Sequence, residues 1–152
     1  MNIIKAQKTI FNALLSGKQV RRCEHDKDNV FITVDGIIAY VLPYSVLQVN
    51  LDRIKEMRNQ IDTLSIVKEE NIFRLTREML IKEHPKELYR KLTNGDRNVF
   101  INQKYLEYFQ NPKFYQKEKN QMVVVTEDIS VTRKNVIVGI IMPVRVEEDL
   151  FK

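Results

Sequence analysis

The sequence has one cysteine, no tryptophan, four glycines and four prolines in 152 residues. A single cysteine cannot form an internal disulfide, which excludes the disulfide-stabilised secreted class and favours a reducing compartment. The low glycine and proline content excludes collagen-like and low-complexity chains, and 43% hydrophobic residues exclude a disordered chain. A chain of this length can bury an ordinary hydrophobic core, so we expect one folded domain.

Long apolar runs are also missing. No run approaches the ~18–20 residues that a membrane span needs, and the N-terminal residues lack the apolar core and small-residue cleavage site of a signal peptide. The sequence therefore predicts a cytoplasmic protein without a membrane partner.

Acidic residues are absent from residues 1–22, which carry five basic side chains and so a charge of +5. The remaining 20 Lys and Arg are balanced by all 20 Asp and Glu, so this segment accounts for the whole net charge of +5. An ordinary basic surface explains such an excess. The functional alternative is a polyanion-binding element, because clustered cations release counterions from a phosphate backbone.

Two segments have the apolar spacing of a helix. The first covers residues 6–16, ends before Gly17, and places Lys5, Lys8 and Asn12 on a polar face without acids. The second begins after Asn102, a residue type that caps helix N-termini, and stops at residues 111–112, Asn-Pro. We expect these two to be the main helices.

Strand patterns surround a clear turn signal. Asp-Gly at residues 35–36 separates two β-branched and aromatic runs, 30–34 and 37–42, and this pattern predicts a hairpin. Further expected strands are 19–23, 114–119, 122–126 and 136–146, the last as a central strand. Residues 44–95 are less regular: they suggest a helical stripe and a short helix over 85–92, and the segments 64–67 and 72–76 could each be a strand. We predict an α+β fold with an inserted helical segment.

Residues that could carry catalysis are few. Cys23 and His25 lie next to Asp26, but a tetrahedral zinc site needs more ligands than this chain supplies. His84 and the acidic clusters at 69–70 and 147–149 are typical of solvated positions. The glycine-rich motifs that bind phosphates or dinucleotides, and the nucleophile-elbow motif, are all missing. We expect no enzyme, no metal and no cofactor. A deep pocket lined by Cys23, His25 and Asp26 would reverse the first expectation.

Two blocks of the C-terminal third resemble a known family. Residues 101–106 read Ile-Asn-Gln-Lys-Tyr-Leu and residues 140–146 read Ile-Ile-Met-Pro-Val-Arg-Val. They are similar to the Phe-Asn-x-Lys-Tyr-Leu and Met-Pro-Val-Arg-Leu blocks in the last domain of the bacterial DNA polymerase sliding clamp. The resemblance lies mainly in residues 97–146 and is faint at 34–39. It implies one DNA-clamp-like domain over 1–146, with two main helices on curved antiparallel sheets and with 44–95 as an atypical insertion.

The resemblance also implies a function. The chain would be a non-enzymatic, sliding-clamp-like protein of a phage or mobile element, associated with duplex DNA or the replication machinery. Cellular clamps use several such domains, so encircling DNA would require a homo-oligomer of this chain. Polar side chains would contact phosphates without reading sequence. The expected DNA contacts are Lys5, Lys8, Asn12, Lys18, Arg21, Arg22 and Lys104.

The alternative is a protein-interaction module of a mobile element that binds host replication proteins without binding DNA. The family's partner pocket uses its terminal strand, which corresponds here to Ile140, Met142, Pro143, Val144 and Arg145. Residues 147–152 form an acidic tail that resembles the clamp-binding peptide Gln-x-Asp/Ser-Leu-Phe, with Glu in place of Gln. Its expected contacts are Asp149, Leu150 and Phe151. The simpler explanation of the tail is an ordinary frayed terminus.

Overall fold

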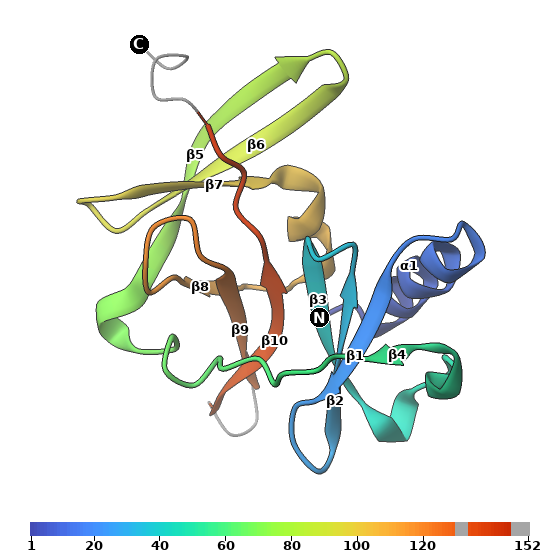
Figure 1. Cartoon of the computed structure of the whole chain (residues 1–152). Helices are drawn as coiled ribbons and strands as arrows, with labels where there is room; N and C mark the ends of the chain where they lie inside the picture. The colour runs from blue at the N-terminus through green and yellow to red at the C-terminus, as the bar shows by residue number, and fades with distance from the viewer. Residues whose placement is uncertain (130–133, 147–152) are drawn as a thin grey trace.

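The computed structural model describes residues 1–129 and 134–146 (Figure 1). Its elements are one α-helix, four short 3-10 helices named η, and ten strands within the described ranges. The helices are α1 (Ile3–Leu15), η1 (Tyr44–Val46), η2 (Leu51–Arg53), η3 (Glu69–Asn71) and η4 (Gln103–Tyr108). The strands are β1 (Val20–Glu24), β2 (Asn29–Val34), β3 (Ile38–Pro43), β4 (Lys55–Glu56), β5 (Ile72–Glu83), β6 (Lys86–Thr93), β7 (Asn98–Asn102), β8 (Lys113–Tyr115), β9 (Val123–Ile129) and β10 (Lys134–Ile141).

All the strands belong to one sheet, in the order β4-β1-β2-β3-β10-β9-β8-β5-β6-β7. Neighbours are antiparallel except β1 and β4, which are parallel. β10 lies in the interior of the sheet between β3 and β9, as its continuous apolar sequence predicts. β5 pairs first with β8 and then, from Arg74 onward, with β6. The β5–β6 hairpin therefore extends away from the rest of the sheet (Figure 1).

The predicted architecture of two main helices on curved sheets is wrong, and with it the clamp-like fold class. Only α1 is an α-helix among the described residues, and the sheet dominates the structure. The segment after Asn102 forms the six-residue 3-10 helix η4. Asn102 caps it as predicted, through its side-chain oxygen on the Lys104 N–H. The segment has only six residues before Phe109, whose backbone is extended, which is less than two turns of an α-helix. It forms the i→i+3 hydrogen bonds of a 3-10 helix, which is used in short pieces.

The expected helical insertion at 44–95 is also wrong. Its described helices are the single turns η1, η2 and η3, and the short helix expected over 85–92 is strand β6. β6 has a strand partner on each side, β5 and β7. Hydrogen-bonded pairing on both edges overrides the weak helical pattern of the local sequence.

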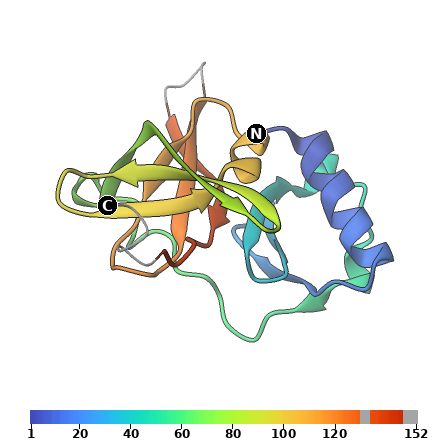
Figure 2. The same cartoon turned by 90° about the horizontal axis from the view of Figure 1, so that it is seen from above.

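Helix α1 and the hairpin after it follow the sequence closely. α1 ends at Leu15, shortly before Gly17, whose φ is 74°, and the β2–β3 turn has positive φ at Asp35 and Gly36. The loop is one residue longer than predicted, because Val34 pairs with Ile38. The buried face of α1 packs on β1, β2 and β3 (Figure 2).

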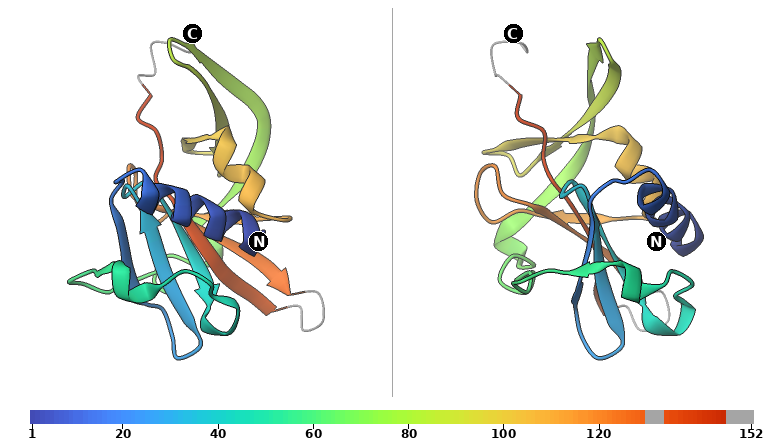
Figure 3. Two further views of the ribbon diagram at one scale, coloured as in Figure 1. Left: turned by 90° about the vertical axis from the view of Figure 1, so that its right-hand side faces the viewer. Right: turned by 45° about the vertical axis from the view of Figure 1, so that its right-hand side comes forward.

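The face of α1 that points to solvent is not purely polar. Ile4, Phe11 and Leu15 are 82%, 55% and 73% exposed. η4 lies on the same side of the sheet as α1 (Figure 3). The Thr9 hydroxyl of α1 and the Tyr108 hydroxyl of η4 form a hydrogen bond of 2.7 Å. α1 and η4 therefore form one surface with mixed apolar and basic side chains.

Candidate functional site

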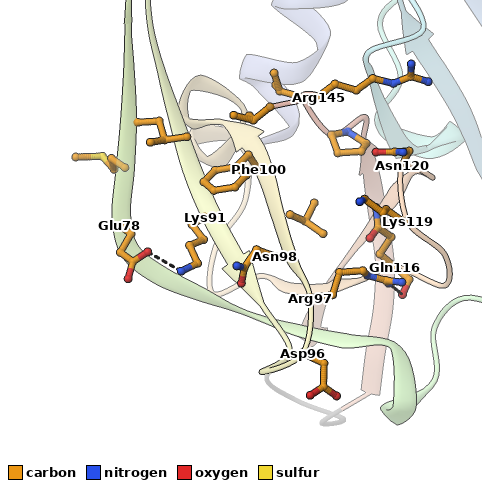
Figure 4. Close-up of a pocket in the computed structure, with 16 residues that line it drawn as sticks. Glu78, Lys91, Asp96, Arg97, Asn98, Phe100, Gln116, Lys119, Asn120 and Arg145 are labelled. Carbon is orange, nitrogen blue, oxygen red and sulfur yellow. Dashed lines mark hydrogen bonds and ion pairs between the residues drawn. The ribbon is translucent and has the colours of Figure 1, made fainter. Parts of the chain in front are cut away.

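A groove of about 1010 Å³ lies between the β5–β6 hairpin, β7 and the end of the described chain. Figure 4 shows Glu78 and Lys91 on one side and Lys119 and Asn120 on the other. Residues 143–146 also line it. Four segments that are distant in the sequence therefore meet at one concave surface.

The C-terminal wall of the groove is held by two main-chain hydrogen bonds. The Met142 N–H donates to the Ile37 carbonyl at 2.7 Å, and the Val144 N–H donates to the Phe100 carbonyl at 2.8 Å. β7 is the last strand of the sheet, and within the described residues Val144 forms the only bridge to its outer edge. The groove thus runs beside a sheet edge, the kind of surface that can pair with an added strand.

Basic side chains predominate in the groove. The Lys91 ammonium is 2.6 Å from the Glu78 carboxylate, so these two charges are paired. Arg97 also lines the wall and donates to the Gln116 carbonyl at 3.2 Å. The basic lining residues are Lys91, Arg97, Lys119 and Arg145, and the acidic ones are Glu78 and Asp96. The groove therefore has more positive than negative charge.

The side chains of Lys119 and Arg145 are exposed, and neither makes a hydrogen bond or ion pair with another described residue. They come from two different walls of the groove, the 116–120 loop and the C-terminal segment. Both cations are thus free to meet an acidic group that enters from solvent.

Two buried polar atoms beside the groove lack hydrogen-bond partners among the described residues. They are Nε of Arg97 and Oε1 of Gln116. Gln116 is only 1% exposed, and its Nε2 donates to the Gln121 carbonyl at 2.7 Å. An unmet buried donor or acceptor costs about 1–3 kcal/mol. The groove wall therefore retains a cationic donor group that is incompletely satisfied.

The predicted partner contacts fall in different environments. Pro143, Val144 and Arg145 line the groove. Met142 is at the border of exposure, at 36%, and is not part of the lining, while Ile140 is 5% exposed within the core. The predicted tail contacts Asp149, Leu150 and Phe151 lie outside the described residues.

Some of the predicted DNA contacts are exposed on the surface formed by α1 and η4. Lys8, Asn12, Lys18 and Lys104 are exposed, and the Lys104 ammonium lies 5.1 Å from the centre of the Tyr105 ring. These side chains share their surface with the exposed apolar residues of α1. The face predicted to be polar is therefore mixed.

The other predicted DNA contacts are partly buried, and Lys5 and Arg22 have partners within the protein. The Lys5 ammonium is 2.5 Å from the Glu107 carboxylate. Arg22 donates from Nε to the carbonyls of Leu51 and Ile54 at 3.0 and 3.1 Å. It also pairs with Glu56 at 3.2 Å. Arg21 is partly buried in β1. Arg22 in particular fastens the 51–56 segment to the sheet.

Cys23, His25 and Asp26 do not share a pocket. Cys23 is buried in the core, and this burial raises the pKa of its thiol. A small hollow of about 280 Å³ has Cys23 in its wall but neither His25 nor Asp26. The His25 ring packs edge-on against Phe31, with centroids 4.7 Å apart. Among the described residues, no group of three or more His, Cys, Asp or Glu could hold a metal ion.

The prediction of a short helix over 85–92, where the structure has strand β6, left most of the groove unassigned. The Asn-Gly dipeptide at residues 94–95 follows directly on β6. The same dipeptide between two apolar runs is a hairpin signal. Interpreted that way, it would have paired β6 with β7, which in the structure places Lys91 opposite Phe100.

No helix of the described residues is long and apolar enough to span a membrane. No family model matches the chain, and searches of curated proteins and of solved structures find no match.

Proposed function

We propose that this chain is a non-enzymatic binding protein that holds an extended, acidic segment of a partner protein in the groove. The observation that supports this most directly is the presence of Lys119 and Arg145, two exposed cations on different walls of the groove, beside the outer edge of the sheet at β7. A sheet edge binds extended peptides through main-chain hydrogen bonds, and flanking side chains select the sequence.

The charges of the groove favour acidic side chains at defined places. Carboxylates would meet Lys119 and Arg145 at the rim, and Arg97 deeper in the wall. Rim charges mainly accelerate association and suppress wrong partners. Their effect weakens with salt, because exposed charges are screened over about 8 Å at physiological ionic strength. Partner binding should therefore be strongly salt-dependent.

Apolar side chains of the partner would contact the apolar part of the groove lining. Leu80, Phe100 and Pro143 are partly exposed there. An acidic segment with interspersed leucine or phenylalanine would match both kinds of surface. We propose a replication protein as the partner, in the cytoplasm of a host that carries a phage or mobile element. The sequence resemblance to sliding clamps supports this choice.

The test measures the fluorescence anisotropy of a labelled peptide of alternating Asp and Leu, titrated with the full chain. Binding should weaken with added NaCl and fall by about tenfold in the Lys119→Glu, Arg145→Glu double variant, as loss of about 1.4 kcal/mol of interaction would produce. The matched control reverses Lys27 and Lys55, which are exposed and lie outside the groove. Equal losses in both double variants, or equally tight binding of a Lys–Leu peptide, would refute the proposal.

Binding of duplex DNA is the second candidate. It is favoured by the exposed lysines Lys8, Lys18 and Lys104 on and next to α1 and η4. Reversing these three charges should reduce DNA affinity and flatten its dependence on salt concentration. The Lys119→Glu, Arg145→Glu variant should bind DNA like the unmodified chain. Absence of DNA binding at low ionic strength removes this candidate and leaves the groove proposal intact.

A further inference from the structure

We propose that the groove is also the binding site of the chain's own acidic tail, residues 147–152, which would compete with the partner segment. The proposal rests on the proposed function of the groove and adds its regulation. The tail follows directly on Val146, which lines the groove together with Arg145. The tail therefore starts at the site that it would occupy.

The charge of the tail matches that of the groove. Its sequence, Glu-Glu-Asp-Leu-Phe-Lys, has three carboxylates in its first three positions and one basic residue at its last. The groove provides Lys119 and Arg145, which are exposed and have no ionic partner among the described residues. Glu147, the first acid of the tail, is two positions from Arg145.

The apolar part of the tail matches the rest of the lining. In the tail, the apolar residues Leu150 and Phe151 follow the three acids. The groove likewise has both charged and apolar lining, the apolar part at Leu80, Phe100 and Pro143. Six residues extend to about 20 Å, enough to return along a groove of this size.

Attachment of the tail next to the groove favours occupation by the same chain. A segment joined by a short linker experiences an effective concentration of about the millimolar range, so even weak contacts suffice to compete with a free peptide. A partner must then displace the tail. The apparent affinity of the partner is therefore reduced in proportion to the fraction of grooves that the tail leaves unoccupied.

The experiment compares the full chain with a full-length variant in which Glu147, Glu148 and Asp149 are all changed to Lys. The probe is the labelled Asp–Leu peptide. We expect the tail variant to bind it at least about fivefold more tightly, because the competitor no longer fits. The matched control changes three exposed acids outside the groove to Lys, namely Asp52, Glu69 and Glu70. An equal gain in the control would attribute the effect to net charge and overturn the proposal.

A second measurement does not depend on the probe. Amide spectra of the full chain and of the tail variant should differ at Lys119 and Asn120, which line the groove but are more than 25 positions away from the changed residues. Unchanged amides there would overturn the tail proposal, whatever the peptide does. If the peptide binds both forms equally, the tail proposal fails and the proposed function stands. If the amides shift but neither form binds the peptide, the proposed function fails and the tail contact stands.

Light scattering shows whether the tail that occupies a groove comes from the same molecule or from a second copy. Occupation within one chain predicts a monomer for both the full chain and the tail variant. Self-association of the full chain that is lost in the tail variant would place the tail in the groove of another copy and overturn the proposal.

Discussion

The main-chain N–H of Val144 donates to the carbonyl of Phe100 at 2.8 Å, and this bridge joins the C-terminal segment to the outer edge of the sheet. The two residues are 44 positions apart (144 minus 100), and each lines the groove. This is one of the two main-chain hydrogen bonds that hold the C-terminal wall of the groove, and its strength can be tested.

Replacing Val144 with proline removes the N–H of this bridge. We expect the C-terminal wall to loosen, with faster amide exchange at Met142 and weaker peptide binding. The free energy of unfolding should fall by about 0.5–1.5 kcal/mol, the usual net worth of one hydrogen bond. Val144→Ala keeps the N–H and serves as the control. Equal amide exchange at Met142 in the two variants would show that the bridge does not hold the wall.

Gly139 in β10 has no room for a side chain. A Cβ at this position would lie 2.6 Å from the Ala39 carbonyl oxygen and 2.9 Å from Cζ of the Phe109 ring. The backbone contact cannot be relieved by a rotamer change, so Gly139→Ala should destabilise the fold by about 1–3 kcal/mol in urea denaturation. Lys134→Ala, on the same strand but exposed, should stay within about 0.5 kcal/mol of the unmodified chain.

The sequence predicts those parts of the fold whose structure is decided locally. The positive φ of Asp35 and Gly36, the glycine at the end of α1 and the cap at Asn102 all depend on neighbouring residues. The β5–β6 hairpin could not be predicted in the same way. Its strands have mixed polarity and are partly exposed on both faces, so their apolar residues follow neither the repeat of a helix nor the alternation of a strand. Pairing with β7 and β8 decides their structure.

The candidate site was only partly predictable for a related reason. Pro143 and Arg145 were expected from the resemblance in the terminal strand, and they do line the groove. Lys119 and Lys91 could not be assigned to it, because their place follows from which strands become neighbours in the sheet. The basic N-terminal segment shows the opposite problem. Its charge count is correct, but counting charges cannot show that Arg22 is used inside the fold.

Arg22 should behave as a structural residue. Arg22→Ala leaves the carbonyls of Leu51 and Ile54 without their charged donor, so we expect a loss of about 1.5–3 kcal/mol in the free energy of unfolding. Lys18→Ala, an exposed change from the same basic segment, should have almost no effect. Urea denaturation of both variants provides the comparison. If both changes were equally neutral, Arg22 would not fasten the 51–56 segment to the sheet.

Cys23 should make the stability of the fold depend on pH in the alkaline range. Burial raises the pKa of its thiol above the ordinary value of 9.0. In the unfolded chain the thiol therefore loses its proton first, and that ionisation favours unfolding. The contribution is fully present below pH 9.0 and is lost as the pH rises toward the folded pKa.

Other groups titrate in the same range, so the effect of Cys23 must be measured as a difference. Urea denaturation of the unmodified chain and of Cys23→Ala, below and above pH 9.0, isolates it. We expect the advantage of the unmodified chain over the variant to shrink as the pH rises. Because only the thiolate reacts readily, alkylation of Cys23 should also be slow in the folded chain and accelerate in urea. A constant difference in stability together with rapid alkylation of the folded chain would mean that the thiol is open to solvent.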